Sequence, residues 1–526
     1  MSLSRQNFSD QEFCPTISFY WLIRRLQVRI LLGALVLLYA GTMFQRRFRL
    51  QRSAAQRLQS AYDELASDLP HDFPAPVLEE TRSAITDLTD PFAPGRDGLD
   101  SPKQDYTHIP FVTIDPPGAR DLDQAMHLSQ DSTETDTFTV MYAIADVGRF
   151  IKPGGQLDQE TRTRGQTIYL PDRKIPLHPQ ELSEDAASLL PEQTRSAYVF
   201  AAHVTTDGKL TDYTLERAVV RSLAQLDYAT VQHQWEQGQD LHPSIALLPQ
   251  VGEALLADAR ARGAIDLAIP DQEVTDTFTL QYRPRGGIED FNAQISLLAG
   301  RIAAQLQIKA GAGVLRTLNY PDEDTVEKFH AIVRTLGFEP RDTYQETLRS
   351  IDHLGDDPRA LAVHYASPML FRGAGYTLVG TDPDPVQAAV GAPYAHATAP
   401  LRRLVDRFVL PIAEAAARNA PTPSVDGLED IISIMKSTGS VASRIDKEAI
   451  ETTEAVLLSD RVGDEFTGVV VGHKKRDDSP VLNVHVPDPA VVVDVKGEAP
   501  VGQEVRIRLE SVQDNTPVFT IAEHDA

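Results

Sequence analysis

Three aspartates lie close together in one short stretch, and carboxylates in such a group can bind a divalent cation. Asp115 ends an apolar run rich in β-branched residues, the turn-forming Pro116-Pro117-Gly118 follows, and Asp121 and Asp123 come soon after. Two like charges about 4 Å apart repel by roughly 4 kcal/mol at an effective dielectric constant of about 20, so such a loop calls for a cation. Hard oxygen ligands suit Mg²⁺, which combines one or two carboxylates with substrate phosphate oxygens. The pattern indicates metal-assisted attack on a phosphodiester, with a plain surface turn as the alternative.

A second stretch, from Tyr394 to Val409, carries two adjacent arginines. Arg402 and Arg403 follow Pro400 at the start of an amphipathic helical pattern. Backbone N–H groups at a helix start and guanidinium groups together make a site for an anion such as a phosphate. Alone this pattern is unspecific, but its presence in the same chain favours the phosphodiester interpretation of the acidic loop.

In this order, and with the segment between them, the two stretches resemble the ribonuclease II and ribonuclease R family, whose shared catalytic unit is called the RNB domain. The family's opening motif, TID followed by an acidic DxDD, is similar to TID at residues 113–115 and RDLDQ at 120–124. Its closing motif, Y-T-H-x-T-S-P-I-R-R, is similar to YAHATAPLRR at residues 394–403. The intervening residues 143–191 are similar to the family's strand, long loop and YLP segment.

The resemblance implies a 3′-to-5′ exoribonuclease that hydrolyses single-stranded RNA to nucleoside 5′-monophosphates with Mg²⁺, or alternatively Mn²⁺. A metal-activated water would attack the last phosphodiester, and Arg402 would neutralise charge on the scissile phosphate. Carried over by position, the expected metal ligands are Asp115, Asp121 and Asp123. The expected catalytic residues are Asp123, Arg402 and Arg403.

Tyr169, in the segment Thr167 to Pro171, matches the family aromatic that holds the 3′-terminal nucleotide. Stacking on a base contributes about 1–3 kcal/mol and tolerates any sequence. The alternative is a tyrosine that closes a strand before a proline. The resemblance also implies RNA contacts from Tyr394, His396 and Arg402, although His396 could instead only orient its loop.

Gln124 departs from the family pattern, which usually has a fourth aspartate at this position. A neutral amide can coordinate a metal or position water but contributes no charge, so the resemblance predicts one metal ion more firmly than two. Gln124 and the acidic composition also favour an alternative of another class, a catalytically weakened RNA-binding protein on an RNB scaffold. The three retained aspartates, Tyr169 and both arginines favour the active nuclease.

The chain is strongly acidic for a protein expected to bind RNA. It has 526 residues and a formal net charge of −25, and residues 1–52 hold eight arginines against two acidic residues, so the remainder carries −31. A surface this acidic repels a polyanion, so RNA binding must be confined to a local basic channel. The single cysteine, Cys14, excludes a disulfide framework and a cysteine-based metal site, and a cytoplasmic location is expected.

The first 42 residues form a hydrophobic leader with two interpretations. Residues 30–45 are uncharged, rich in leucine and flanked by arginines, but a membrane span needs about 20 apolar residues. The segment is either a weak membrane anchor or an extension that is not translated, with Met43 as an internal start. We favour the second interpretation, in which membrane contact is expected only if residues 30–45 are present.

The pattern of the rest predicts an α+β protein with a mixed sheet wrapped by helices. We expect a helical N-terminal region at 43–100, an RNB catalytic domain at 101–435 and a helical connector at 436–462. About five short alternating strands at 463–526 resemble an OB-fold RNA-binding β-barrel. Single-stranded RNA is the expected partner, no protein partner is evident, and a monomer is expected.

Overall fold

The computed structural model describes residues 54–526 apart from 132–135, 266–270, 276–278, 284–285, 353, 355–356, 425–426, 477–478, 514 and 523–526. The fold described below is that of residues 58–526, which form one compact unit. The hydrophobic leader at 1–42 and the apolar stretch at 30–45 lie outside the described residues. Among the helices of the described ranges, none is both long and apolar enough to cross a membrane.

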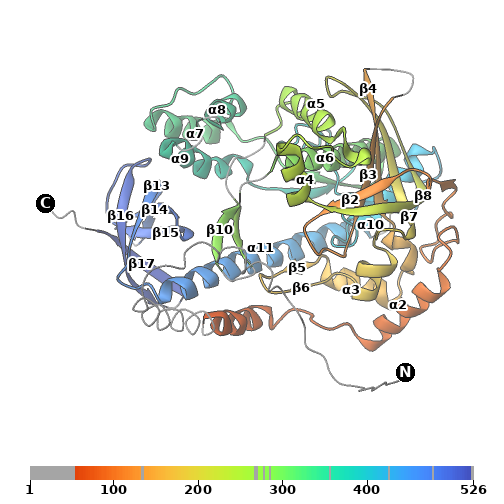
Figure 1. The fold of residues 1–526 in the computed structure, drawn as a ribbon, viewed down its shortest axis with the longest axis horizontal. Helices are drawn as coiled ribbons and strands as arrows, with labels where there is room; N and C mark the ends of the chain where they lie inside the picture. The colour runs from red at the N-terminus through yellow and green to blue at the C-terminus, as the bar shows by residue number, and fades with distance from the viewer. Residues whose placement is uncertain are drawn as a thin grey trace, which may run out of the picture. The chain divides into compact units, whose positions relative to one another are not determined.

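A six-stranded mixed sheet holds the acidic loop (Figure 1). Its strand order is β1-β8-β2-β3-β4-β7, and β8 also pairs with β7. The first half of the long strand β8 pairs antiparallel with β7, and its second half runs parallel to β2. The strands are β1 (Gln104–Asp105), β2 (Phe111–Asp115), β3 (Gln124–Gln130), β4 (Thr137–Ala145), β7 (Thr194–Thr205) and β8 (Leu210–Asp227).

Both faces of this sheet are covered by helices, because apolar residues of its strands point to both sides. Val112 and Ile114 of β2 belong to a core that includes residues of α5, α6 and α10, whereas Phe111 and Ala143 pack with α2 and α3. Continuous apolar runs are typical of strands buried on both faces, and β4 has such a run. The helices are α2 (Ala75–Asp87), α3 (Gln156–Arg164), α4 (Tyr228–Glu236), α5 (Leu248–Ala261), α6 (Gly287–Ala310) and α10 (Asp406–Ala417).

Short elements connect these layers. The hairpin of β5 (Ile168–Tyr169) and β6 (Lys174–Ile175) is followed by a π-helical turn, η2 (Leu182–Ala186). The remaining small strands pair as β9 (Asp271–Val274) with β10 (Leu280–Arg283), and β11 (Val314–Thr317) with β12 (Gly375–Leu378). The other helical segments are η1 (Val147–Phe150), η3 (Pro243–Ile245), α7 (Glu323–Thr335), α8 (Tyr344–Asp352), α9 (Pro358–Ala366) and η4 (Ser367–Phe371).

The C-terminal strands form the predicted barrel. It is closed in the order β13-β14-β15-β17-β16 around a core of valine, isoleucine and phenylalanine side chains. The long helix α11 (Leu428–Ser459) contacts α3 and β5 and also β16 and β17, so it joins the sheet region to the barrel (Figure 1). The barrel strands are β13 (Glu465–Arg476), β14 (Ser479–Pro487), β15 (Ala490–Lys496), β16 (Glu504–Gln513) and β17 (Thr516–Ile521).

The prediction that a helix starts at Arg402 and Arg403 was wrong. Helix α10 begins at Asp406, and residues 401–405 form turns and an isolated bridge. The reason is local, because the buried Asp406 carboxylate accepts hydrogen bonds from the backbone N–H of Ala399 and from Arg403. These contacts favour a tight loop before the helix, so backbone donors of a helix start do not add to an anion site at Arg402.

Candidate active site

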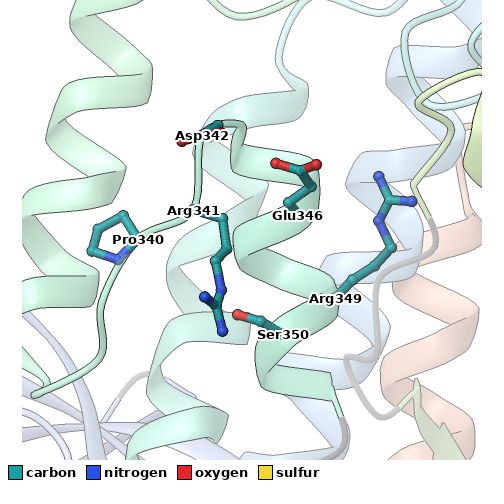
Figure 2. A pocket seen from close by; sticks show the side chains of 6 residues that line it. All are labelled: Pro340, Arg341, Asp342, Glu346, Arg349 and Ser350. Atoms are coloured by element: carbon teal, nitrogen blue, oxygen red, sulfur yellow. The ribbon is translucent and has the colours of Figure 1, made fainter.

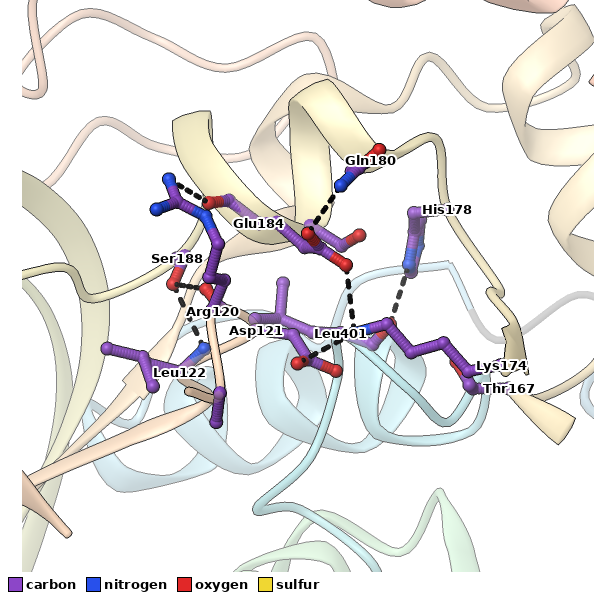
Figure 3. Close-up of polar contacts among 12 residues, drawn as sticks. Arg120, Asp121, Leu122, Thr167, Lys174, His178, Gln180, Glu184, Ser188 and Leu401 are labelled. Carbon is purple, nitrogen blue, oxygen red and sulfur yellow. Dashed lines mark hydrogen bonds and ion pairs between the residues drawn. The ribbon is translucent and has the colours of Figure 1, made fainter. Parts of the chain in front are cut away.

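A backbone hydrogen bond joins the acidic loop to the arginine turn. The buried Asp123 Oδ1 accepts from the backbone N–H of Leu401 at 2.8 Å. On the other side of Leu401, its carbonyl oxygen lies 3.0 Å from Nδ1 of His178, which is buried (Figure 3). Burial raises the pKa of Asp123 to about 8, although the nearby Arg402 and the Leu401 N–H oppose this rise.

Asp121 faces a lysine. The Lys174 ammonium lies 2.9 Å from Asp121 Oδ1 and 2.9 Å from Glu184 Oε1 (Figure 3). Burial works against the charged ammonium, but hydrogen bonds from Lys174 to both carboxylates raise its pKa above the ordinary value. The Lys174 ammonium therefore supplies part of the positive charge that offsets the carboxylates of the acidic loop.

The segment 120–122 is clamped to the chain that follows η2. Ser188 Oγ donates to the Arg120 carbonyl oxygen at 2.6 Å and accepts from the Leu122 N–H at 3.0 Å. The Leu189 N–H donates to the Leu122 carbonyl oxygen at 3.0 Å. These bonds fix the backbone on both sides of Asp121.

Asp115 ends β2 and has a buried carboxylate oxygen that needs a partner. Its Oδ2 has no hydrogen-bond partner among the described residues. Burial raises the pKa of Asp115 to about 6; the nearby Thr113 side chain opposes this rise, and the negative charge of Asp121 adds to it. A buried, unsatisfied carboxylate oxygen is costly unless a proton or cation reaches it.

Gln124 makes contacts from both ends of its amide that hold the fold together. Its Nε2 donates to the Thr398 carbonyl oxygen at 2.6 Å, and its Oε1 accepts from the Tyr142 hydroxyl at 2.5 Å. The Ser296 hydroxyl lies 2.7 Å from that of Tyr142 and completes the network. We therefore assign Gln124 a structural role, which ties β3 to β4, α6 and the loop before Arg402.

The two arginines have different environments. Arg402 is exposed, and among the described residues its guanidinium has no hydrogen-bond or ion-pair partner. Arg403 is instead held by Asp406, with Nε donating to Oδ2 at 3.0 Å and Nη2 to Oδ1 at 2.9 Å. Arg402 is free to bind an anion, whereas Arg403 is committed to a bidentate ion pair.

Tyr169 is open to solvent beside the carboxylates. It is 49% exposed and lies directly opposite Lys174 in the β5–β6 pair. Side chains directly opposite each other in an antiparallel pair lie on the same face. The hairpin therefore presents an aromatic ring and the ammonium that contacts Asp121 on one side.

Tyr394 and His396 are less exposed than Tyr169 and Arg402. Their rings meet edge to face at 5.8 Å, and the Tyr376 hydroxyl lies 2.8 Å from His396 Nδ1. A methyl group at Gly300 of α6 would come within 2.1 Å of the Tyr394 ring, so Tyr394 needs a glycine there. Burial lowers the pKa of His396 well below its ordinary value, with nearby arginines acting in the same direction.

The three aspartates suit a cation but do not form a complete cage. Within the described ranges, no three His, Cys, Asp or Glu side chains converge as a metal site. Asp123 gives one oxygen to Leu401, and Asp121 gives one to Lys174. The unsatisfied Asp115 oxygen and the hard donor set fit a cation that takes its other ligands from substrate and water.

A hollow elsewhere has mixed charge. It has a volume of about 620 Å³ beside α8 and is lined by Pro340, Arg341, Asp342, Glu346, Arg349 and Ser350 (Figure 2). Its two arginines are matched by two acidic residues, so its charge does not favour RNA. We therefore place the candidate site at the acidic loop.

Sequence reasoning missed Lys174, Glu184, His178 and Asp406. Only Lys174 left a usable signal, because an antiparallel hairpin across Leu170 to Arg173 brings it opposite Tyr169. The roles of Glu184, His178 and Asp406 depend on contacts between segments that are distant in the sequence, so no local pattern indicates them.

The fold is that of a known protein family. Residues 103–419 match the RNB domain, and residues 464–517 match the RNase II-type exonuclease C-terminal S1 domain. The chain belongs to the RNB-domain family.

Its relatives are longer proteins. It is 28% identical over 436 residues to ribonuclease R of Escherichia coli, covering 77% of this chain and 52% of that protein. It is 30% identical over 242 residues to exoribonuclease 2 of Vibrio parahaemolyticus, covering 45% of this chain and 36% of that protein. The chain thus spans about half or less of these two relatives.

Solved structures share the fold. RNase R of Mycoplasma genitalium, in complex with ribose methylated single-stranded RNA, has a TM-score of 0.76 and 18% identity, covering 88% of this chain and 77% of that one. Yeast Ssd1, described as a pseudonuclease, has a TM-score of 0.65 and 16% identity, covering 78% of this chain and 53% of that one. The fold is therefore shared by a ribonuclease and by a protein described as a pseudonuclease.

Proposed function

We propose that this chain is a 3′-to-5′ exoribonuclease that hydrolyses single-stranded RNA to nucleoside 5′-monophosphates with Mg²⁺ or Mn²⁺. The observation that carries the proposal is the exposed, unpaired Arg402 on the turn whose Leu401 N–H is bound by Asp123. An available guanidinium beside carboxylates suits a phosphodiester, because it can neutralise charge that develops on the phosphate. Family membership supports the same chemistry.

Each side chain has a role in this proposal. Arg402 binds the scissile phosphate, and Tyr169 stacks on the 3′-terminal base. Asp115, Asp121 and Asp123 would hold the divalent cation, which when bound would activate a water for attack. Arg403, which the family resemblance implies to be catalytic, instead positions the turn in this proposal through its ion pair with Asp406.

Tyr394 and His396 have a supporting role in this proposal. They support the loop that carries Arg402, since their rings pack against each other and the Tyr376 hydroxyl contacts the His396 ring. An RNA contact from either is compatible with their place beside the loop but needs the RNA to reach a deeper position.

The domain division follows the same proposal, with catalysis at 101–435 and RNA binding by the barrel at 463–526. Arg506 and Arg508 are exposed on β16 and suit RNA phosphates. The boundary at 435 falls inside α11, so a continuous helix connects the two functions. A cytoplasmic location and a single-chain state belong to the proposal.

A second candidate function is a catalytically weakened RNA-binding protein. Gln124 stands where the family resemblance expects an aspartate, and its amide is tied to the Thr398 carbonyl oxygen. Lys174 also occupies an oxygen of Asp121. Both features reduce the number of carboxylate oxygens available to metal.

The test is the identity of the products. Internally labelled single-stranded RNA is incubated with the protein and Mg²⁺, and the products are separated beside nucleoside 5′- and 3′-monophosphate standards. The proposal expects 5′-monophosphates and no products in EDTA. Intact RNA that migrates as a complex with the protein would support the RNA-binding candidate.

A further inference from the structure

The Lys174 ammonium lies between the carboxylates of Asp121 and Glu184, where a cation is needed to offset their negative charge. Its Nζ is 2.9 Å from an oxygen of Asp121 and 2.9 Å from an oxygen of Glu184. The side chains of Lys174, Asp121 and Glu184 are 29%, 19% and 12% exposed. Removing the ammonium would leave two largely buried carboxylates facing each other, which is unfavourable.

The surrounding backbone keeps this arrangement in place. Lys174 is fixed by the β5–β6 pairing, and Glu184 lies on the π-helical turn η2. Gln180 Nε2 donates to the other oxygen of Glu184 at 2.7 Å, and Ser188 clamps the backbone next to Asp121 (Figure 3). π-Helical turns occur frequently at functional sites.

We infer that the Lys174 ammonium is a built-in cation that holds the Asp121 oxygen a second divalent ion would need, so that this site takes up one divalent ion rather than two. The inference rests on the proposed function, because it concerns the metal of that site. It assigns Lys174 as a residue that sets the metal content of the site.

The charge of the site agrees with this assignment. If metal binding ionises all four carboxyl groups, they exceed the two cations by two charges, which one divalent ion neutralises; the residues are Asp115, Asp121, Asp123, Glu184, Lys174 and Arg402. A second divalent ion would give these residues a positive excess before any RNA phosphate is bound. The neutral Gln124, whose amide bonds the Thr398 carbonyl oxygen and the Tyr142 hydroxyl, supplies no further carboxylate for it.

The experiment counts bound metal and does not depend on turnover. The full chain is titrated with Mn²⁺ alone and with Mn²⁺ plus a single-stranded RNA whose 3′-terminal linkage resists cleavage, and free Mn²⁺ is measured by electron paramagnetic resonance. Lys174→Met removes the charge but keeps an unbranched side chain. If this variant does not fold, Lys174→Gln is used instead, because it removes the charge and keeps a hydrogen-bond donor. Lys174→Arg retains the charge, and Lys209→Met, in an exposed pair with Asp207, is the matched surface control.

We expect one Mn²⁺ per chain in the parent protein, Lys174→Arg and Lys209→Met. We expect a second Mn²⁺ per chain in Lys174→Met or Lys174→Gln. Unchanged stoichiometry in a folded Lys174→Gln would overturn the inference and leave the proposed function standing. Two ions in the parent protein would also overturn it, and no Mn²⁺ binding by the parent protein would overturn both.

Discussion

The Asp123 carboxylate accepts a hydrogen bond from the backbone N–H of Leu401, 2.8 Å away and 278 positions later in the chain. His178 contacts the carbonyl oxygen of the same residue, so Leu401 is held on both sides. The acidic loop and the turn with Arg402 are thereby coupled directly. This contact places a free guanidinium next to the buried carboxylate, and the proposed chemistry depends on it.

The two adjacent arginines should respond differently to substitution. Arg402→Ala removes an exposed, unpaired guanidinium, so we expect a rate loss of about 10²–10³-fold with an unchanged unfolding temperature. Arg403→Ala leaves the buried Asp406 carboxylate without its partner, which costs about 3–5 kcal/mol of unfolding free energy. Denaturant unfolding and initial rates on single-stranded RNA measure both effects, and equal stability losses in the two variants would contradict the assignment.

Tyr169→Ala should change where degradation stops more than whether it occurs. Loss of a stacking platform removes about 1–3 kcal/mol from the hold on the terminal base, so the smallest limit product should lengthen. Tyr320→Ala is the matched control, because Tyr320 is 47% exposed and Tyr169 49%. Identical end products and rates for both variants and the parent would make Tyr169 merely structural.

Replacing Gln124 by an acidic residue should harm the protein. In Gln124→Glu the carboxylate cannot donate to the Thr398 carbonyl oxygen, and two acceptors then face each other. Leaving a buried acceptor unsatisfied costs about 1–3 kcal/mol. We expect a lower unfolding temperature and no decrease in the Mg²⁺ concentration for half-maximal rate, for Gln124→Glu and Gln124→Asp alike. If a Gln124 variant needed less Mg²⁺ than the parent at unchanged stability, a fourth carboxylate would improve metal binding at this site, contrary to our expectation.

The raised pKa values of Asp115 and Asp123, about 6 and about 8, predict how metal-free stability depends on pH. Aspartates in an unfolded chain titrate near about pH 4, so above that pH the folded state binds more protons than the unfolded state. The stability from these two groups is complete below about pH 4 and is lost as the pH rises through about 6 and then about 8.

Thermal unfolding in EDTA from about pH 5 to about pH 9 measures this loss. From these two groups we expect the unfolding temperature to fall up to about pH 8 and then level off, and we expect Asp123→Asn to flatten the upper part of the fall. A fall above about pH 7 that is equally steep in Asp123→Asn would contradict the assignment of the higher pKa to Asp123.

The sequence predicts the elements better than the contacts between them. The barrel predicted at 463–526 was confirmed, because the alternation of its short strands is a local pattern. The start of α10 was misplaced, since Asp406 holds the preceding turn through contacts that no periodicity records.

Within the site, the family motifs locate the aspartates and arginines but not their partners. Glu184 meets Lys174 only because a hairpin and a π-helical turn converge on Asp121. Gln124 reaches Thr398 across much of the chain, so its structural role has no signal in its neighbours. Likewise, among the described residues, Arg403 is ion-paired and Arg402 is not because the Asp406 carboxylate lies beside Arg403.

The most direct test of the account is a time course with 5′-labelled single-stranded RNA and Mg²⁺, run for the parent protein and for Asp123→Asn. In the variant, the amide oxygen can still accept from the Leu401 N–H, so the fold is kept while the negative charge is lost. The account predicts a ladder of shortening products with the parent protein, and intact RNA with Asp123→Asn, which binds that RNA within a few-fold of the parent. Intact RNA with the parent protein, or parallel loss of binding and turnover in Asp123→Asn, would contradict it.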